Sequence, residues 1–292
     1  MFPIILAHGI ARFDILREKV AQELNISPNS LDDQLQYFRN IRTFLELNGF
    51  TNIKNTNVQF ANSVTVRAET LTNKVNDFLI QTGAEKVHII AHSMGGLDAR
   101  WMIVKMGMAE KVASLTTIGT PHLGTVLADR IFGIGGNFLL NSLENLFGIE
   151  LDGFKDLTTE ACNKFNDELR DAEVKNSVVY QTYASYEHIN KMFLPLVLSW
   201  AIIRVFEETN DGLVPFSSQK WTDKLIASDG ADKTIKQKEF PIPADHLNQV
   251  GWWDSQEAVN SFIGGSWLEQ RDDFEAKIKA VYLEIANGLK EL

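Results

Sequence analysis

A serine at a tight corner is the residue of this sequence best suited to chemistry. Ser93 follows an apolar run, Val87–Ala91 (VHIIA), and a helical pattern begins directly after it. Ala91 and Gly95 stand two positions to either side, and a sharp strand-to-helix turn needs small residues there because the two backbones come close together. The pattern A-x-S-x-G predicts that Ser93 is a nucleophile. An ordinary strand-to-helix turn is the alternative interpretation.

A serine hydroxyl becomes a good nucleophile only when a neutral imidazole takes its proton and a carboxylate orients that imidazole. When the serine sits at such a corner, the usual chain order is serine, then acid, then histidine. Asp211 (in ETNDGLVP) and His246 (in PADHLNQVG) fit this order. Asp211 could also be a plain Asp-Gly turn, and His246 an exposed loop histidine. Asp245 adjoins His246 and would orient it poorly, whereas His188 precedes Asp211 and fits the order badly.

The developing oxyanion of an acyl-transfer reaction needs backbone N–H donors. One donor usually comes from the residue after the nucleophile, here Met94. The other usually comes from a loop after an early strand, and LAHGIAR supplies that loop with Ile10 as its donor. We expect His8 to brace this loop and not to react.

Two further histidines lie near the serine in sequence. His122 (in GTPHLG) follows Ser93 too closely and has no acid between, so we expect a structural role at the pocket wall. His92 neighbours the serine, and side chains that flank such a corner usually point away from it.

Short apolar runs alternate with helical patterns, which predicts one α/β domain over residues 1–292 with a mostly parallel, doubly wound sheet. A stretch at roughly 125–207 breaks the alternation, and we expect it to be a lid or cap insertion over the carboxyl edge of the sheet. The predicted strands are Pro3–Leu6, Val87–Ala91, Leu115–Ile118 and Ser177–Tyr180, and the predicted helices include Leu31–Leu47, Val66–Leu79 and one carrying Phe274, Ile278, Val281, Tyr282 and Ile285 on one face.

Several motifs together resemble the true bacterial triacylglycerol lipases of the α/β-hydrolase fold. They are PIILAHGI, AHSMGG, TTIGTPHLGT, NDGLVP and DHLNQVG, in the order that this family has them. The resemblance implies the α/β-hydrolase fold, beginning at the strand near residue 3. It also implies Ser93, Asp211 and His246 as the catalytic triad.

The segment Phe138–Leu151 follows a glycine-rich stretch, GIGGN, and carries a broad apolar face. We expect an amphipathic lid that covers the active site and opens at a lipid surface. A plain core helix would give the same pattern.

Composition excludes several other classes of protein. The formal net charge of −10 argues against nucleic acid as a partner, because phosphate binding needs a basic surface. One cysteine, Cys162, allows no internal disulfide. The apolar run Met192–Ile203 is too short to span a bilayer and contains Pro195. No signal peptide is visible, so we expect a cytoplasmic protein, with leaderless secretion or a trimmed mature chain as the alternative.

These observations predict a serine carboxylic-ester hydrolase, with a triacylglycerol lipase as the leading interpretation. The substrate would be a lipid or another ester, and no obligate protein partner is indicated. A carboxylesterase, a phospholipase or an acyltransferase on the same scaffold is the alternative among enzymes. A catalytically silent lipid-binding protein is the alternative from another class, and the intact set of serine, acid and histidine argues against it.

The resemblance also implies a structural calcium ion, and here the sequence departs from the family. The family places one aspartate ligand two residues after the catalytic histidine, where this chain has Asn248. The other should lie before the turn of the acid, but 186–206 contains no aspartate and Lys191 stands near the expected place. Calcium favours carboxylate ligands, so we expect the ion to be absent or weakly bound and predict no cofactor.

Without calcium, the loop that carries the histidine needs other support. We expect Trp252 and Trp253 to pack beneath it. Asp245 and Asp254 could instead form a displaced metal site.

Overall fold

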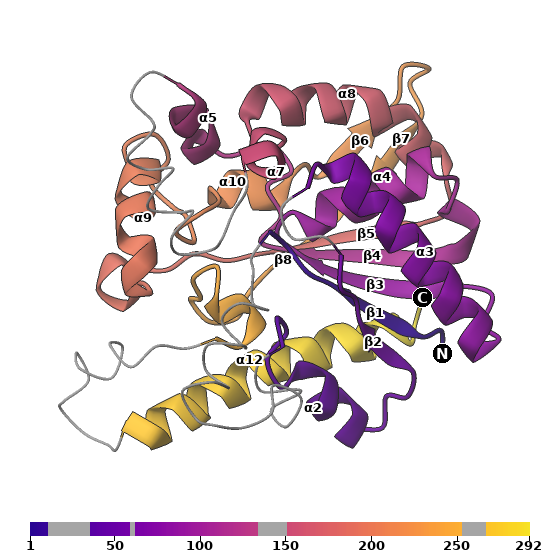
Figure 1. Ribbon diagram of the computed structural model, residues 1–292, viewed down its shortest axis with the longest axis horizontal. Coiled ribbons are helices and arrows are strands. Elements are labelled where there is room, and N and C mark those ends of the chain that lie inside the picture. The colour runs from indigo at the N-terminus through magenta and orange to yellow at the C-terminus, as the bar shows by residue number, and fades with distance from the viewer. Residues whose placement is uncertain (11–35, 59–61, 134–150, 253–266) are drawn as a thin grey trace.

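A parallel sheet of six strands forms the centre of the molecule (Figure 1). The computed structural model describes residues 1–10, 36–58, 62–133, 151–252 and 267–292. The strand order is β2-β1-β3-β4-β5-β8, and every neighbouring pair is parallel. These strands are β1 (Ile4–Ala7), β2 (Ile53–Asn55), β3 (Val87–His92), β4 (Val112–Ile118), β5 (Val179–Ala184) and β8 (Lys236–Glu239).

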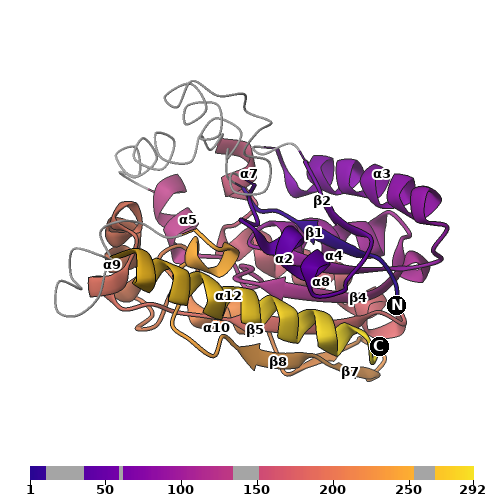
Figure 2. The same cartoon turned by 90° about the horizontal axis from the view of Figure 1, so that it is seen from below.

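Helices cover both faces of this sheet. In Figures 1 and 2, α2 and α12 lie on one face, and α3, α4 and α8 lie on the other. A small antiparallel pair, β6 (Lys224–Ile226) with β7 (Asp232–Thr234), stands apart from the main sheet. The helices are α2 (Ile41–Leu47), α3 (Val64–Thr82), α4 (Gly95–Lys105), α5 (Val126–Phe132), α7 (Leu151–Lys155), α8 (Thr159–Lys175), α9 (Val197–Arg204), α10 (Phe216–Lys220) and α12 (Trp267–Leu289).

The apolar patterns account for this layering. All six residues of β3 are buried, as expected for a central strand that is covered on both faces. The predicted apolar face of α12 packs into the core on its side of the sheet, with Ile278, Val281, Tyr282 and Ile285 all buried. The predicted doubly wound α/β fold is therefore confirmed.

The stretch 125–207 is not one continuous insertion, which corrects the boundaries we expected for the cap. It contains β5, which pairs with both β4 and β8, and α8, which packs on α4. The predicted strand Ser177–Tyr180 overlaps the start of β5, and the expected boundaries were too wide because α8 is a polar helix of the outer layer. The elements that do lie at the carboxyl end of the sheet are α5, α7 and α9 (Figure 1).

The structure does not describe most of the proposed lid, because most of Phe138–Leu151 lies in 134–150, outside the described residues. Among the residues that are described, no helix is long and apolar enough to cross a membrane.

The strand order also creates a place for a site. From β1 the chain moves outward to β2 and then returns to the other side of β1 to form β3. Ligands of open α/β sheets bind where the strand order reverses in this way, outside the carboxyl ends of the strands. The loop after β1 carries Ile10, and the turn after β3 carries Ser93, so both lie at this point.

Candidate active site

Ser93 occupies a strained turn between β3 and α4. Its φ is 55°, in the left-handed region that costs energy for residues other than glycine. Hydrogen bonds to the end of β4 and to the segment after it hold it there. Its N–H donates to the carbonyl oxygen of Ile118 at 2.9 Å, and its own carbonyl accepts from Thr120 Oγ1 at 2.8 Å. Backbone strain that the surrounding structure holds in place in this way is typical of a functional position.

The two glycines after the serine leave no space for a side chain. A Cβ at Gly95 would lie 2.6 Å from the carbonyl oxygen of His8, and a Cβ at Gly96 would lie 2.2 Å from Thr120 Oγ1. Ala91, two residues before the serine, is fully buried. The close approach of helix and strand is therefore the reason that small residues stand here.

Asp211 and His246 form a buried hydrogen-bonded pair. Asp211 Oδ2 lies 2.7 Å from His246 Nδ1, and the His246 N–H also donates to the Asp211 carbonyl oxygen at 2.9 Å. The other carboxylate oxygen, Oδ1, accepts from the N–H groups of Leu213 and Val214 at 3.0 and 2.8 Å. Hydrogen bonds to both of its oxygens thus fix the orientation of the Asp211 carboxylate.

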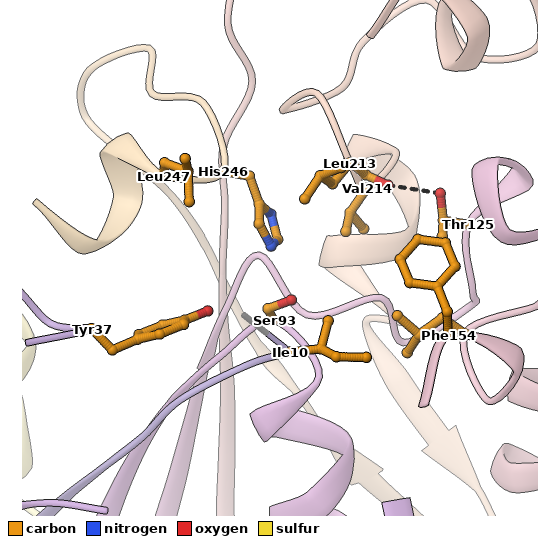
Figure 3. A pocket seen from close by; sticks show the side chains of 10 residues that line it. Ile10, Tyr37, Ser93, Thr125, Phe154, Leu213, Val214, His246 and Leu247 are labelled. Atoms are coloured by element: carbon orange, nitrogen blue, oxygen red, sulfur yellow. Dashed lines mark hydrogen bonds between the residues drawn. The ribbon is translucent and has the colours of Figure 1, made fainter. Parts of the chain in front are cut away.

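One pocket brings the histidine and the serine together. Figure 3 shows the imidazole of His246 pointing toward Ser93, with Tyr37 on one side and Ile10 and Phe154 on the other. The walls are mostly apolar. The lining residues are Ile10, Tyr37, Ser93, Thr125, Phe154, Leu157, Leu213, Val214, His246 and Leu247.

The two predicted oxyanion donors flank the serine. Met94 follows it at the start of α4, and Ile10 lines the same pocket. Among the described residues, neither N–H donates a hydrogen bond to a protein acceptor.

The loop that carries Ile10 is braced by buried polar groups. His8 accepts from the Val58 N–H at Nε2 (3.0 Å), so its Nδ1 carries the hydrogen that meets the Gly9 carbonyl oxygen at 2.8 Å. Arg67 Nη2 donates to the His8 carbonyl oxygen at 2.9 Å and pairs with Asp98 at 2.7 Å. Burial raises the pKa of Asp98 to about 6. His8 has the bracing role expected of it, whereas no sequence signal pointed to Arg67.

Comparison with known families gives this geometry a context. Residues 21–225 match the family described as "Putative serine esterase (DUF676)", which is more than half of the chain. The chain belongs to this serine esterase family. It is a serine ester hydrolase, and the matched range includes Ser93 and Asp211 but ends before His246.

Relatives of this serine esterase agree with the assignment. It is 29% identical to "Triacylglycerol lipase 2" of Saccharomyces cerevisiae over 98% of this chain and 90% of that protein. It is also 29% identical to a "Triacylglycerol lipase" of Vibrio cholerae over 99% of this chain and 88% of that protein.

A solved structure shows the same fold. The mature lipase BlEst2 of Bacillus licheniformis superposes with a TM-score of 0.60 at 20% identity, covering 84% of each chain. The α/β-hydrolase fold that the resemblance implied is therefore confirmed for the esterase.

Sequence reasoning missed three residues beside the site. His92, which we expected to point away from Ser93, has its ring centroid 4.5 Å from the ring centroid of His246. It contacts Tyr37 Oη at 2.7 Å and Gln249 Oε1 at 3.0 Å. Gln249 stands three residues after His246, about one turn onward, which is the one signal that could have found it. Tyr37 offered no signal.

Two other histidines of the esterase lie away from the reacting groups. His122, for which we expected a place at the pocket wall, is not among the residues that line the described pocket. It is buried, contacts Thr117 Oγ1 at 2.9 Å and stacks on Trp221 with ring centroids 4.6 Å apart. Burial, with the charge of Arg100 adding to it, lowers the pKa of His122 well below its usual value. His188 is exposed.

Asn248, at one of the family's calcium positions, and Asp245, a candidate for a displaced metal site, are both engaged in hydrogen bonds in this esterase. Asp245 Oδ1 accepts from the N–H groups of Leu247 and Asn248, and its Oδ2 accepts from the Phe193 N–H at 2.8 Å. Asn248 accepts from the Asp245 N–H and donates to the Trp252 carbonyl oxygen at 2.9 Å. Burial raises the pKa of Asp245 to about 7. Oxygens engaged in this way do not suit a calcium ion as ligands, because the ion prefers several oxygens, carboxylates among them, directed at one point.

A direct contact links the two segments that the ion would join. The Phe193–Asp245 hydrogen bond ties the upstream segment to the loop of His246. Trp252 adds support beneath it, since its Nε1 donates to the Tyr37 carbonyl oxygen at 3.1 Å. Trp253 and Asp254 lie outside the described residues.

Proposed function

We propose that this esterase hydrolyses lipid esters with Ser93 as nucleophile, His246 as base and Asp211 as the acid that orients the base. The observation that carries this proposal is the Asp211–His246 hydrogen bond of 2.7 Å at the wall of the pocket that holds Ser93. The strained turn of Ser93 supports it. Metal and cofactor have no part in the proposed reaction.

Each group has a defined task in the proposed reaction. Asp211 accepts the hydrogen of His246 Nδ1, which leaves Nε2 free to take the proton of Ser93. The serine oxygen attacks the ester carbonyl, and the N–H groups of Met94 and Ile10 stabilise the oxyanion. His246 then gives the proton to the leaving alcohol, and water releases the carboxylic acid from the acyl-enzyme by the same steps.

The pocket walls favour an apolar acyl group. Ile10, Phe154, Leu157 and Leu213 surround the serine, and burial of each methylene contributes about 0.8 kcal/mol. The two relatives above are named triacylglycerol lipases, and we extend that substrate to this chain as part of the proposal.

Active-site labelling tests the nucleophile. A fluorophosphonate probe should label the protein once, at Ser93, and Ser93→Ala should lose both labelling and ester hydrolysis. Ser114→Ala removes another buried serine hydroxyl, within β4, and should keep both. Labelling that survives in Ser93→Ala would show that the assignment is wrong.

A substrate series tests the lipid part of the proposal. Hydrolysis of p-nitrophenyl esters should become more efficient as the acyl chain lengthens, and an emulsified triacylglycerol should be cleaved. Activity confined to the shortest esters would favour a carboxylesterase.

A further inference from the structure

Gln249 contacts the proposed catalytic acid directly. Its Nε2 donates to Asp211 Oδ2 at 2.9 Å, the same oxygen that His246 Nδ1 meets at 2.7 Å. Its Oε1 lies 3.0 Å from His92 Nε2. All four side chains are buried, so water does not compete for these hydrogen bonds.

The proposed role of Asp211 as a carboxylate determines which atom carries the hydrogen in each of these hydrogen bonds. An ionised Asp211 accepts only, so the Gln249 group that faces it is the amide NH2. The amide oxygen then faces His92, whose Nε2 must carry the hydrogen. His92 Nδ1 is consequently an acceptor, and the partner at 2.7 Å, Tyr37 Oη, donates to it.

The chain of contacts continues to the oxyanion loop. The Gly9 backbone N–H hydrogen-bonds to the Tyr37 hydroxyl, and Gly9 directly precedes the proposed donor Ile10. A Cβ at Gly9 would lie 2.6 Å from Tyr37 Oη and 2.6 Å from Ser93 Cβ, so these groups are in close contact. Desolvation by burial, with the nearby His246 adding to it, lowers the pKa of His92 well below its usual value and keeps the ring neutral.

Packing holds Gln249 in this one place. A Cβ at Gly119, where φ is +58°, would lie 2.1 Å from Gln249 Oε1. On the other side, Tyr282 Oη donates to the Gln249 carbonyl oxygen at 2.9 Å. The side chain therefore has a pre-formed slot and little freedom to turn away from Asp211.

We propose that Gln249 is a positioning residue for Asp211, held in its working orientation by His92 and Tyr37. It supplies a neutral hydrogen-bond donor to the carboxylate oxygen that orients His246. Through Tyr37 it also couples that oxygen to the loop of the oxyanion donor. This inference rests on the proposed roles of Ser93, Asp211 and His246.

The pH profile of Gln249→Glu tests the inference. The introduced carboxyl, when protonated, donates to Asp211 as the amide does, so kcat/KM near pH 6 should stay within about threefold of the wild type. Burial beside a second carboxylate raises the pKa of that carboxyl. Above this pKa the two carboxylates repel, and kcat/KM should fall by about tenfold per pH unit. The wild type should show no such alkaline loss up to pH 9.

Gln181→Glu is the matched control. Gln181 is a buried glutamine of β5 that donates to Thr116 Oγ1 and does not contact Asp211. Its variant should follow the wild-type profile. Melting temperatures across the same pH range separate loss of rate from loss of fold. A folded Gln249→Glu enzyme whose profile parallels the wild type would overturn the inference.

Tyr37→Phe provides a second test if Gln249→Glu does not fold. Loss of the hydroxyl leaves the buried Nδ1 of His92 without its hydrogen-bond donor, so the ring no longer holds the Gln249 amide firmly against Asp211. We expect kcat to fall by about fivefold or more with KM little changed. Tyr180→Phe, which removes a buried hydroxyl that accepts from Asn176 Nδ2, should leave kcat unchanged. Unchanged kcat in Tyr37→Phe would overturn the link through His92.

The two proposals fail in different ways. If Ser93→Ala kept its activity, the proposed function itself would be wrong. If activity depends on Ser93 and His246 while Gln249→Glu behaves as the wild type, only the positioning role is wrong.

Discussion

The Asp211 carboxylate shows how single residues prepare this site. Each oxygen accepts two hydrogen bonds, Oδ1 from two backbone N–H groups and Oδ2 from His246 and Gln249. A carboxylate whose two oxygens are both held by hydrogen bonds keeps one orientation. The orientation of the proposed base, His246, is therefore set before any substrate binds.

Single substitutions should show which histidine is needed for turnover and which is not. His246→Ala should lower kcat by about 10⁴-fold or more, as removal of a triad base does. In the wild type, kcat should fall as the solution becomes acidic, because a protonated imidazole cannot accept the serine proton. His188→Ala is the control, since that side chain is exposed and should leave kcat unchanged. A rate that stays flat well into the acid range would contradict the role of His246.

At the scale of elements, the join between β3 and α4 decides the site. The helix begins so close to the loop after β1 that the carbonyl oxygens of Ala7 and His8 would both touch a Cβ at Gly95. Because these contacts are backbone atoms, they cannot rotate out of the way. The two loops that carry Ser93 and Ile10 are thus fixed relative to each other.

A single methyl group should disturb this join. Gly95→Ala should lower the free energy of unfolding by about 1–3 kcal/mol, the usual cost of overpacking, and should reduce kcat as the serine shifts. Gly288→Ala is the matched control, because nothing lies within 4 Å of a Cβ there and it belongs to α12. Alanine is favoured over glycine in a helix by about 1 kcal/mol, so this control should be neutral or stabilising. Chemical denaturation of both variants measures the difference, and equal stability would contradict the steric argument.

At the scale of the whole molecule, buried groups that resist charging shape the response to pH. Burial lowers the pKa of His88 to about 4, although its Nδ1 meets Ser114 Oγ at 2.8 Å. The unfolded chain takes up this proton near pH 6.5, whereas the folded chain does so only near pH 4. Between these values the unfolded state binds more protons, so stability falls as the pH falls.

Replacement of this histidine should remove part of the acid sensitivity. We expect the difference in unfolding free energy between wild type and His88→Asn to change by about 2 kcal/mol between pH 7 and pH 4.5, to the disadvantage of the wild type. Urea unfolding at both pH values gives the measurement. A difference that does not change with pH would show that His88 is charged in the folded protein.

Removal of metal ions with a chelator tests whether the stability of the whole protein depends on calcium. Because Asp245 and Asn248 are committed to backbone groups, EDTA should leave the melting temperature and the activity unchanged, and added calcium should do the same. Asp245→Ala should lower the melting temperature, since it leaves the N–H groups of Leu247, Asn248 and Phe193 without this acceptor. Substantial loss on EDTA treatment that calcium alone restores would show that a displaced metal site exists.

The sequence by itself determined the fold class and the candidate reacting residues. The buried run before Ser93, the small residues around it and the order of Ser93, Asp211 and His246 were enough, because these signals are local or follow chain order. The apolar face of α12 was also readable, since burial of one helix face imposes a period on the sequence.

Only the tertiary structure decided which polar groups meet. Tyr37 lies 55 positions from His92, and His92 lies 157 positions from Gln249. The boundary of the cap also needed the structure: a strand was predicted at Ser177–Tyr180, but its place in the main sheet follows only from the pairing of β5 with β4 and β8. Periodicity records how much of a residue is buried but not against what. The partner of a buried polar atom depends on which loops the strand order brings to one edge of the sheet.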